Sequence, residues 1–220
     1  MIGDEDRSAG RSDPPPGAGR VPSLWEQKVA ADPGHSHWYV ERFRAMARSG
    51  ADLHGEARLI DAMVPRGARV LDAGCGPGRV GGELHRRGHT VVGVDVDPVL
   101  IAAAQEDHPG PTWVVGDLAE LDLPGYGIPE PFDAIVAAGN VLAFAAPVTR
   151  AGIIARLGAH LAPGGRLVVG FGSGRGYAVA EHRVHAATAG LAQDLLLSTW
   201  DLRPWTPQSD FLVAIHSRPI

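Results

Sequence analysis

Hydrophobic residues follow two different spacings along most of the chain. Short apolar runs typical of strands, such as "ARVLDA" at 68–73 and "HTVVGVDV" at 89–96, alternate with segments whose apolar residues recur every three or four positions. This alternation predicts a parallel sheet with helices on both faces. We expect further strands at 111–116, 132–138 and 166–171. In such sheets, ligands bind at the carboxyl ends of the strands.

The two ends of the chain depart from this alternation. "HSHWYVERFRAM" and "ADLHGEARLIDAMV" predict two helices before the first strand. Near the C-terminus, "DLLLSTWDL" and "DFLVAIHSR" have no helix between them, which predicts a hairpin and therefore an antiparallel strand at an edge of the sheet. We expect three parts: a disordered arm at 1–22, rich in Pro, Gly and charge, lid helices at 23–64, and a ligand-binding core at 65–220.

Charge and composition exclude several classes of protein. A net charge of -5 with scattered arginines offers no surface for nucleic acid. No apolar run is long enough to span a membrane, and the first residues lack the pattern of a signal peptide, so we expect a cytoplasmic protein. Cys75 is the only cysteine, which excludes an intrachain disulfide. The sequence does not predict the oligomeric state.

The segment "VLDAGCGPGRVGG" carries two overlapping glycine patterns. Gly76-x-Gly78-x-x-Gly81 fits a dinucleotide-binding loop, whereas Asp72-x-Gly74-x-Gly76-x-Gly78 fits a loop that binds S-adenosylmethionine. An acidic residue after the second strand suits both patterns, so Asp95 does not separate them.

Two other carboxylates favour S-adenosylmethionine. A carboxylate about 4 Å from a pyrophosphate opposes it by roughly 4 kcal/mol at an effective dielectric constant of 20. Asp72 would therefore disfavour a dinucleotide, while the ammonium and sulfonium groups of S-adenosylmethionine would be attracted to it. Asp117 follows the third strand, where its oxygens can accept hydrogen bonds from an adenine amino group.

With "VLDAGCGPG", "VVGVDVDP", "GDLAELDL", "FDAIVAAGNVLAF" and "LAPGGRLVV" in this order, the chain resembles the class I S-adenosylmethionine-dependent methyltransferases from about residue 51 onward. The resemblance implies a three-layer Rossmann-like α/β fold whose seven-stranded sheet has the order 3-2-1-4-5-7-6, with strand 7 antiparallel. It also implies that the glycine loop holds the methionine moiety, Asp95 the ribose and Asp117 with Leu118 the adenine. The cofactor contacts that we expect are Asp72, Ala73, Gly74, Cys75, Gly76, Gly78, Asp95, Val96, Gly116, Asp117, Leu118, Ala138, Gly139 and Asn140.

The methyl acceptor is narrowed mainly by residues that are missing. The segments "AAGN" and "GFGSG" follow the fourth and fifth strands. They lack the motif used to methylate adenine amino groups, the paired glutamates used for protein arginine and the carboxylates that hold a metal for catechol-type transfer. Methylation at pyrimidine C5 needs a cysteine nucleophile, and the only cysteine lies in the cofactor loop. We therefore expect metal-independent, in-line methyl transfer to O, N or C of a small molecule, with S-adenosylhomocysteine as product. A regulatory or assembly protein that binds the cofactor without chemistry, or a nucleotide-dependent oxidoreductase, is an alternative.

The catalytic residue is not identified by the sequence. Tyr39 and His37 are weak candidates, because their segment is the only strongly aromatic one before the core. The expected acceptor pocket is lined by Trp38, Tyr39, Phe144 and Tyr177, with His35, His37, His182 and His185 within reach.

Overall fold

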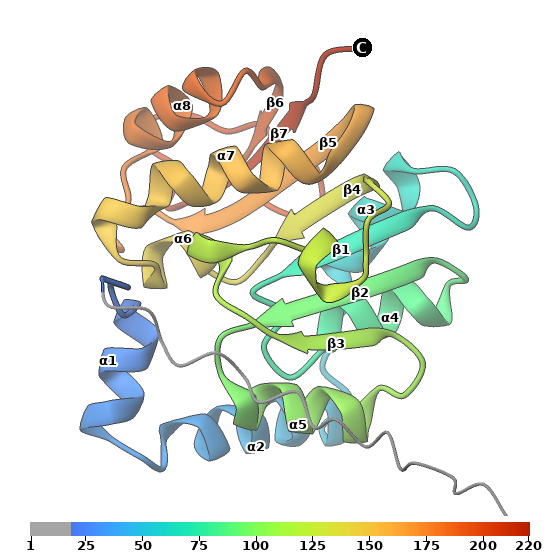
Figure 1. Ribbon diagram of the computed structural model, residues 1–220, viewed down its shortest axis with the longest axis vertical. Coiled ribbons are helices and arrows are strands. Elements are labelled where there is room, and N and C mark those ends of the chain that lie inside the picture. The colour runs from blue at the N-terminus through green and yellow to red at the C-terminus, as the bar shows by residue number, and fades with distance from the viewer. Residues whose placement is uncertain (1–18) are drawn as a thin grey trace, which may run out of the picture.

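A seven-stranded sheet forms the centre of the molecule in the computed structural model, which describes residues 19–220 (Figure 1). The strand order is β3-β2-β1-β4-β5-β7-β6, and β7 runs antiparallel to both of its neighbours. The expected fold is confirmed. The strands are β1 (Arg69–Ala73), β2 (Thr90–Asp95), β3 (Thr112–Val115), β4 (Phe132–Ala137), β5 (Leu161–Gly172), β6 (Ala192–Leu197) and β7 (Phe211–Ser217).

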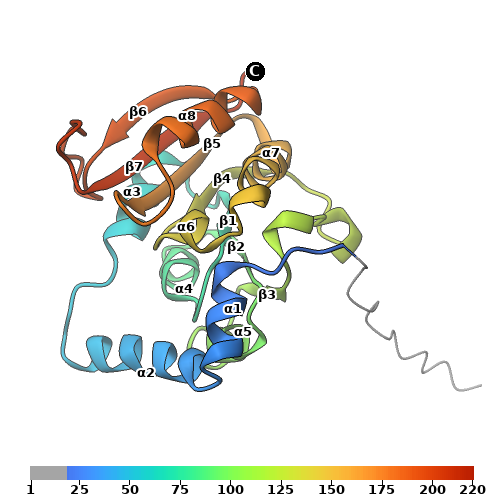
Figure 2. The same ribbon diagram turned by 90° about the vertical axis from the view of Figure 1, so that its left-hand side faces the viewer.

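Helices cover both faces of the sheet. On one face lie α3 (Gly55–Met63), α4 (Arg79–Arg86) and α5 (Pro98–Asp107), and on the other lie α7 (Arg150–His160) and α8 (Val179–Thr188) (Figure 2). Outside these layers, α1 (Leu24–Ala31) and α2 (His35–Arg48) precede the sheet. The short helix α6 (Val141–Phe144) follows β4, and three 3-10 turns occupy Leu118–Glu120, Pro124–Tyr126 and Pro147–Thr149.

Neighbouring residues of one strand enter different cores because side chains of a strand alternate between its faces. On β1, Val70 packs with α3 and α4, whereas Leu71 packs in the core beneath α7 and α8. Both side chains are fully buried. A strand covered on both faces gives a near-continuous apolar run, which is why the central strands could be located from the sequence.

Three sequence expectations need correction. The chain has a third helix before the sheet, α1, which we did not expect. The prediction that the disordered arm extends to residue 22 is wrong, because Arg20 forms ion pairs with Glu26 and Asp117. Residues 1–18 lie outside the described part of the chain. The antiparallel strand is not at an edge, because β7 pairs with both β5 and β6. Between residues 19 and 220, the helices are all too short or too polar to cross a bilayer.

Close packing beneath the glycine loop requires glycine at several positions. A Cβ atom placed at Gly78 or Gly81 would lie 2.9 Å from the indole ring of Trp113 on β3, and one at Gly93 on β2 would overlap the same ring. The Trp113 Nε1 group donates to the carbonyl oxygen of His108 at 3.0 Å, which holds the indole in place. The strand that carries Asp95 is therefore fixed against a rigid side chain.

The Gly93→Ala variant tests this packing. We expect it to lower the free energy of unfolding by about 1–3 kcal/mol, because the added methyl group displaces the Trp113 ring. Gly152→Ala is the control: Gly152 is exposed within α7 and a Cβ there meets no atom within 4 Å, so this variant should gain about 0.5–1 kcal/mol. Urea unfolding measures both. An unchanged stability of Gly93→Ala would show that the ring has room to move.

Candidate functional site

A cleft opens at the carboxyl ends of β1, β2 and β4. It encloses about 1000 Å³ of space, part of it open to solvent. Its wall combines the glycine loop after β1 with side chains from the N-terminal helices and from α6. The lining residues are Ser23, Trp25, Tyr39, Phe43, Asp72, Gly74, Cys75, Gly76, Pro77, Arg79, Val80, Asp95, Val96, Leu100, Gly116, Asp117, Leu118, Ala138, Gly139, Val141, Phe144, Ala145 and Ile153.

The glycine loop is tied to the end of β2. The amides of Gly74 and Cys75 both donate to the carbonyl oxygen of Val94, at 2.8 and 3.0 Å. Gly74 and Gly76 have φ values of 72° and 54°, a region that side chains with a Cβ rarely adopt. A Cβ at Gly74 would also lie 2.6 Å from the side chain of Val141. The turn therefore depends on these glycines for its conformation and for contact with α6.

Asp72 brings a carboxylate to the floor of the cleft. The side chain is only 2% exposed, and its Oδ2 atom accepts one hydrogen bond, from the Gly81 amide at 2.8 Å. Burial raises the pKa of Asp72 to about 7, although the Gly81 hydrogen bond acts in the opposite direction. A carboxylate that is so poorly compensated favours a cationic partner.

Asp95, at the end of β2, organises the loop and also faces the cleft. Its Oδ2 atom accepts from the Gly76 amide at 2.8 Å and its Oδ1 atom from the Asp97 amide at 3.0 Å. Burial raises the pKa of Asp95 to about 6. Each oxygen keeps a second acceptor position, so the carboxylate can still receive hydrogen bonds from hydroxyl groups of a ligand.

Asp117 also lines the cleft, shortly after the end of β3. Its Oδ1 atom accepts from the Ala119 amide at 2.9 Å and caps the 3-10 turn that begins at Leu118. Its Oδ2 atom accepts from Nε of Arg20 at 2.7 Å. Gly116, Leu118 and Val96 line the same region. Three carboxylates thus line the cleft: Asp72 and Asp95 are buried, and Asp117 is partly exposed.

Three of the expected cofactor contacts do not line the cleft. Ala73 is fully buried in the sheet, and Gly78 packs against Trp113. Asn140 adopts φ 70°, and its Oδ1 atom accepts from the Gly172 amide at 2.7 Å. Asn140 therefore joins the β4–α6 turn to the end of β5, whereas its neighbours Ala138 and Gly139 do line the cleft.

Of the aromatic acceptor-pocket candidates, Tyr39 and Phe144 line the cleft. Trp38 is 55% exposed and stacks on His35, outside the cleft. Tyr177 is buried beneath α8, where its hydroxyl group lies 3.3 Å from Nδ1 of His182.

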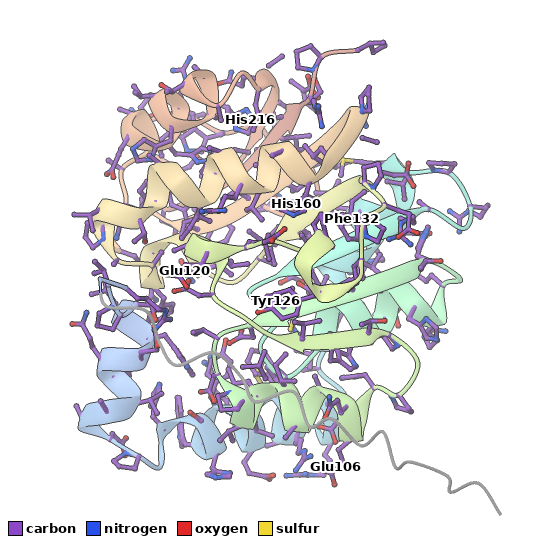
Figure 3. All side chains as sticks on the ribbon, viewed as in Figure 1. Glu106, Glu120, Tyr126, Phe132, His160 and His216 are labelled. Atoms are coloured by element: carbon purple, nitrogen blue, oxygen red, sulfur yellow. The ribbon has the colours of Figure 1, made fainter. Side chains whose placement is uncertain are left out.

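In the described part of the chain, none of the four candidate histidines lines the cleft. His37 is exposed on α2, which removes the geometric basis for a role as base. His182 lies 2.9 Å from His216, a buried residue of β7 that is labelled in Figure 3. His185 lies 3.0 Å from the Tyr177 hydroxyl group. The four histidines therefore lie outside the wall, although His35 packs against Trp25, which is part of it.

The sequence analysis missed Trp25, Phe43 and Arg79. Trp25 belongs to α1, whose start has a capping box formed by Ser23 and Glu26, a signal that the sequence "SLWE" contains. Phe43 stands one helical turn after Tyr39, and their rings meet with centroids 5.0 Å apart.

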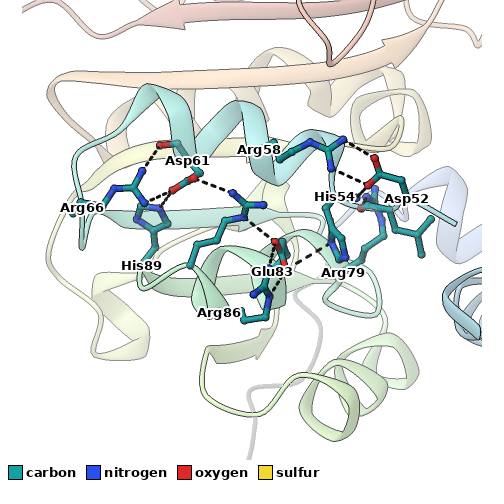
Figure 4. A network of polar contacts seen from close by, with 11 residues as sticks. Asp52, His54, Arg58, Asp61, Arg66, Arg79, Glu83, Arg86 and His89 are labelled. Atoms are coloured by element: carbon teal, nitrogen blue, oxygen red, sulfur yellow. Dashed lines mark hydrogen bonds and ion pairs between the residues drawn. The ribbon is translucent and has the colours of Figure 1, made fainter. Parts of the chain in front are cut away.

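Arg79, in the first turn of α4, brings a positively charged side chain to the cleft wall. Its Nη1 and Nη2 atoms donate to the two carboxylate oxygens of Glu56 on α3, at 2.7 and 2.6 Å. Arg79 also lies near the Phe43 ring, with its Cζ atom 5.6 Å from the centroid. Figure 4 shows Arg79 at one end of the polar network that joins α3 to α4. Glu56 balances most of this charge, so the attraction of Arg79 lowers the pKa of Asp72 by less than burial raises it.

Comparison with known proteins agrees with this geometry. A family model described as a methyltransferase domain matches residues 70–165. The crystal structure of a TehB-like S-adenosylmethionine-dependent methyltransferase from Corynebacterium glutamicum is 46% identical with a TM-score of 0.80, and the match covers 85% of this chain and 100% of that one. This chain therefore belongs to the class I S-adenosylmethionine-dependent methyltransferases.

Curated relatives match over a shorter stretch. An uncharacterized methyltransferase of Mycobacterium tuberculosis is 40% identical over 122 residues, which make up 54% of this chain and 58% of the relative. A magnesium-protoporphyrin O-methyltransferase of Rhodobacter capsulatus is 37% identical over 116 residues, or 49% and 48% of the two chains. The chain thus spans about half the length of these relatives.

The raised pKa of Asp72 makes the stability of the free protein depend on pH. Because the pKa is about 7 in the folded chain and about 3.9 in an unfolded one, protonation favours folding, and this stabilisation is lost as the pH rises toward 7. Relative to Asp72→Asn, the wild type should lose up to about 1.4 kcal/mol per pH unit between pH 5 and 7, and no more above pH 7. Urea unfolding of both proteins over this range measures the difference, and parallel curves would contradict the assignment.

Proposed function

We propose that this chain transfers a methyl group from S-adenosylmethionine to a small-molecule acceptor, by in-line displacement and without a metal. The observation that carries the proposal is the pair of buried carboxylates, Asp72 and Asp95, beside a glycine loop in a mainly apolar cleft. Burial raises the pKa values of both carboxylates, and the attraction of Arg79 for Asp72 is too weak to offset it. A ligand with an ammonium, a sulfonium and a ribose supplies the missing cations and hydroxyl groups.

Each part of the cofactor has a matching part of the cleft. Gly74 and Gly76 let the methionine moiety approach the backbone, and Asp72 attracts its positive charge. Asp95 receives the ribose hydroxyl groups. Asp117 accepts from the adenine amino group, with Leu118 against the ring. The wall at Ala138 and Gly139 borders the methyl end.

The rest of the cleft suits an apolar or aromatic acceptor. Trp25, Tyr39, Phe43 and Phe144 are the aromatic side chains of the wall. Aliphatic side chains also line it, at Val80, Val96, Leu100, Leu118, Ala138, Val141, Ala145 and Ile153. These side chains exclude water and orient the acceptor, which can account for several kcal/mol of barrier lowering. The name of the relative from R. capsulatus specifies an oxygen acceptor, and oxygen is one of the acceptor atoms that this pocket allows.

The chemistry divides simply between ligand and protein. S-adenosylmethionine supplies the methyl group and its own leaving thioether. The protein holds the acceptor in line and keeps water out. Tyr39 is a titratable group of the wall, and burial raises the pKa of its hydroxyl group, so at neutral pH it acts as a hydrogen-bond partner and not as a base.

Ligand discrimination tests the proposal directly. S-adenosylmethionine and S-adenosylhomocysteine should raise the melting temperature, with about 2.7 kcal/mol of stabilisation at 100 times the dissociation constant, whereas NAD should have no effect. Stabilisation by NAD alone would support the oxidoreductase alternative. Release of S-adenosylhomocysteine with a panel of small aromatic nucleophiles then measures transfer, and tight binding without release for any acceptor would favour a regulatory role.

The role of Asp95 is tested by substitution. Asp95→Ala should weaken S-adenosylhomocysteine binding by roughly 1.5–3 kcal/mol for each ribose hydrogen bond lost, and it also releases the Gly76 amide. Asp122→Ala is a suitable control, because Asp122 is exposed and accepts only a local hydrogen bond, from the Gly125 amide. Titration calorimetry compares the two variants with the wild type. An unchanged affinity of Asp95→Ala would remove this carboxylate from the site.

A further inference from the structure

The segment at residues 20–31, here called the N-terminal strap, closes one side of the cleft. Its Ser23 and Trp25 are part of the wall. The indole Nε1 of Trp25 donates to Oδ2 of Asp97 at 2.8 Å, in the turn between β2 and α5. The Trp25 ring also meets Phe144 of α6, with centroids 5.8 Å apart and planes at 88°. The strap therefore joins two loops that border the cleft.

Arg20 fastens the first residue of this strap to the adenine end of the site. Nε of Arg20 donates to Oδ2 of Asp117 at 2.7 Å, while its Nη1 and Nη2 atoms donate to the two oxygens of Glu26 at 2.8 and 3.0 Å. Glu26 also accepts from the backbone amide of Ser23 at 2.8 Å and so completes the cap of α1. One guanidinium group thus connects the start of α1 to Asp117, across 97 residues of sequence.

The geometry leaves Asp117 free to bind a ligand while it is held by Arg20. The carboxylate accepts from Ala119 through Oδ1 and from Arg20 through Oδ2, and each oxygen retains one acceptor position. The side chains of Arg20 and Asp117 are 21% and 15% exposed, so the pair is largely shielded from water. A ligand that donates to Asp117 therefore shares this carboxylate with the strap.

We propose that Arg20 is a positioning residue that couples adenine binding at Asp117 to closure of the strap, and thereby sets the residence time of the cofactor. This inference rests on the proposed function, since it assumes that the adenine lies at Asp117. When the strap is closed, Arg20 fixes the carboxylate that receives the adenine amino group. When the strap opens, the Arg20–Asp117 pair breaks and the adenine loses its oriented partner. Cofactor release and strap opening are consequently one event.

The experiment compares dissociation of S-adenosylhomocysteine from the full chain and three variants. Arg20→Met keeps an apolar stem of similar length but removes both contacts. Glu26→Gln weakens the cap of α1 and leaves the Arg20–Asp117 pair in place. Arg58→Met is the matched control, because Arg58 on α3 is half exposed, pairs with Asp52 and does not line the cleft. Stopped-flow displacement gives the dissociation rates, and hydrogen exchange follows the amides of 24–31.

We expect the dissociation rate to rise about tenfold or more in Arg20→Met, which corresponds to the loss of one charge-assisted contact. Glu26→Gln should raise it less, and Arg58→Met should match the wild type. S-adenosylhomocysteine should slow exchange of α1 amides in the wild type, and this protection should disappear in Arg20→Met. If Arg20 only stabilised the fold, Arg20→Met would instead speed hydrogen exchange of the α1 amides equally with and without S-adenosylhomocysteine.

Arg20→Lys provides a second variant with the charge retained. A single ammonium group cannot reproduce the fork that spans Glu26 and Asp117, so its dissociation rate should lie between those of the wild type and Arg20→Met. The inference is overturned if Arg20→Met releases the ligand at the wild-type rate, if Glu26→Gln has an equal effect, or if ligand protection of α1 persists. Failure of the wild type to bind S-adenosylhomocysteine at all would instead refute the proposed function, and the inference with it.

Discussion

The site depends on two carboxylates that are buried at neighbouring strand ends with few partners. Asp72 accepts one backbone amide, from Gly81, and Asp95 accepts two, from Gly76 and Asp97. A buried charge with so little compensation is costly, and this cost appears as raised pKa values. The backbone must turn tightly to bring even these amides into place, which requires the positive φ angles of the glycine loop. The conformation of the glycine loop and the burial of the two carboxylates therefore depend on each other.

The central strands and the loop were predictable because their signals are local. An apolar run followed by closely spaced glycines marks the end of β1, and nothing distant is needed to recognise it. The cleft walls, in contrast, depend on long-range contacts. Trp25 donates a hydrogen bond to Asp97, 72 residues further along the chain, and no periodic pattern in the sequence predicts this contact. Only the capping box at Ser23 signalled that a helix begins there.

The position of His37 outside the cleft could have been predicted from the sequence. Residues four apart lie on one face of a helix, so Tyr39 and Phe43 point the same way on α2. A residue two positions from Tyr39 lies nearly opposite, and His37 is indeed exposed. Asn140 differs, because its role depends on a hydrogen bond to Gly172 that only the paired strands β4 and β5 create. The sequence was therefore enough to predict which residues share a face of α2, but not which residues form hydrogen bonds between β4 and β5.

The apolar wall and the buried carboxylates act together during a methyl transfer of the proposed kind. The low dielectric that raises the pKa of Asp72 also strengthens its attraction for a cation. S-adenosylmethionine carries a sulfonium charge that S-adenosylhomocysteine lacks, so transfer removes one of the two positive charges near this carboxylate. If the cofactor lies as proposed, the product is held less strongly at the glycine loop, and the contacts at Asp117 become its main attachment. In that arrangement the Arg20–Asp117 pair joins the strap to the part of the site that still holds the product.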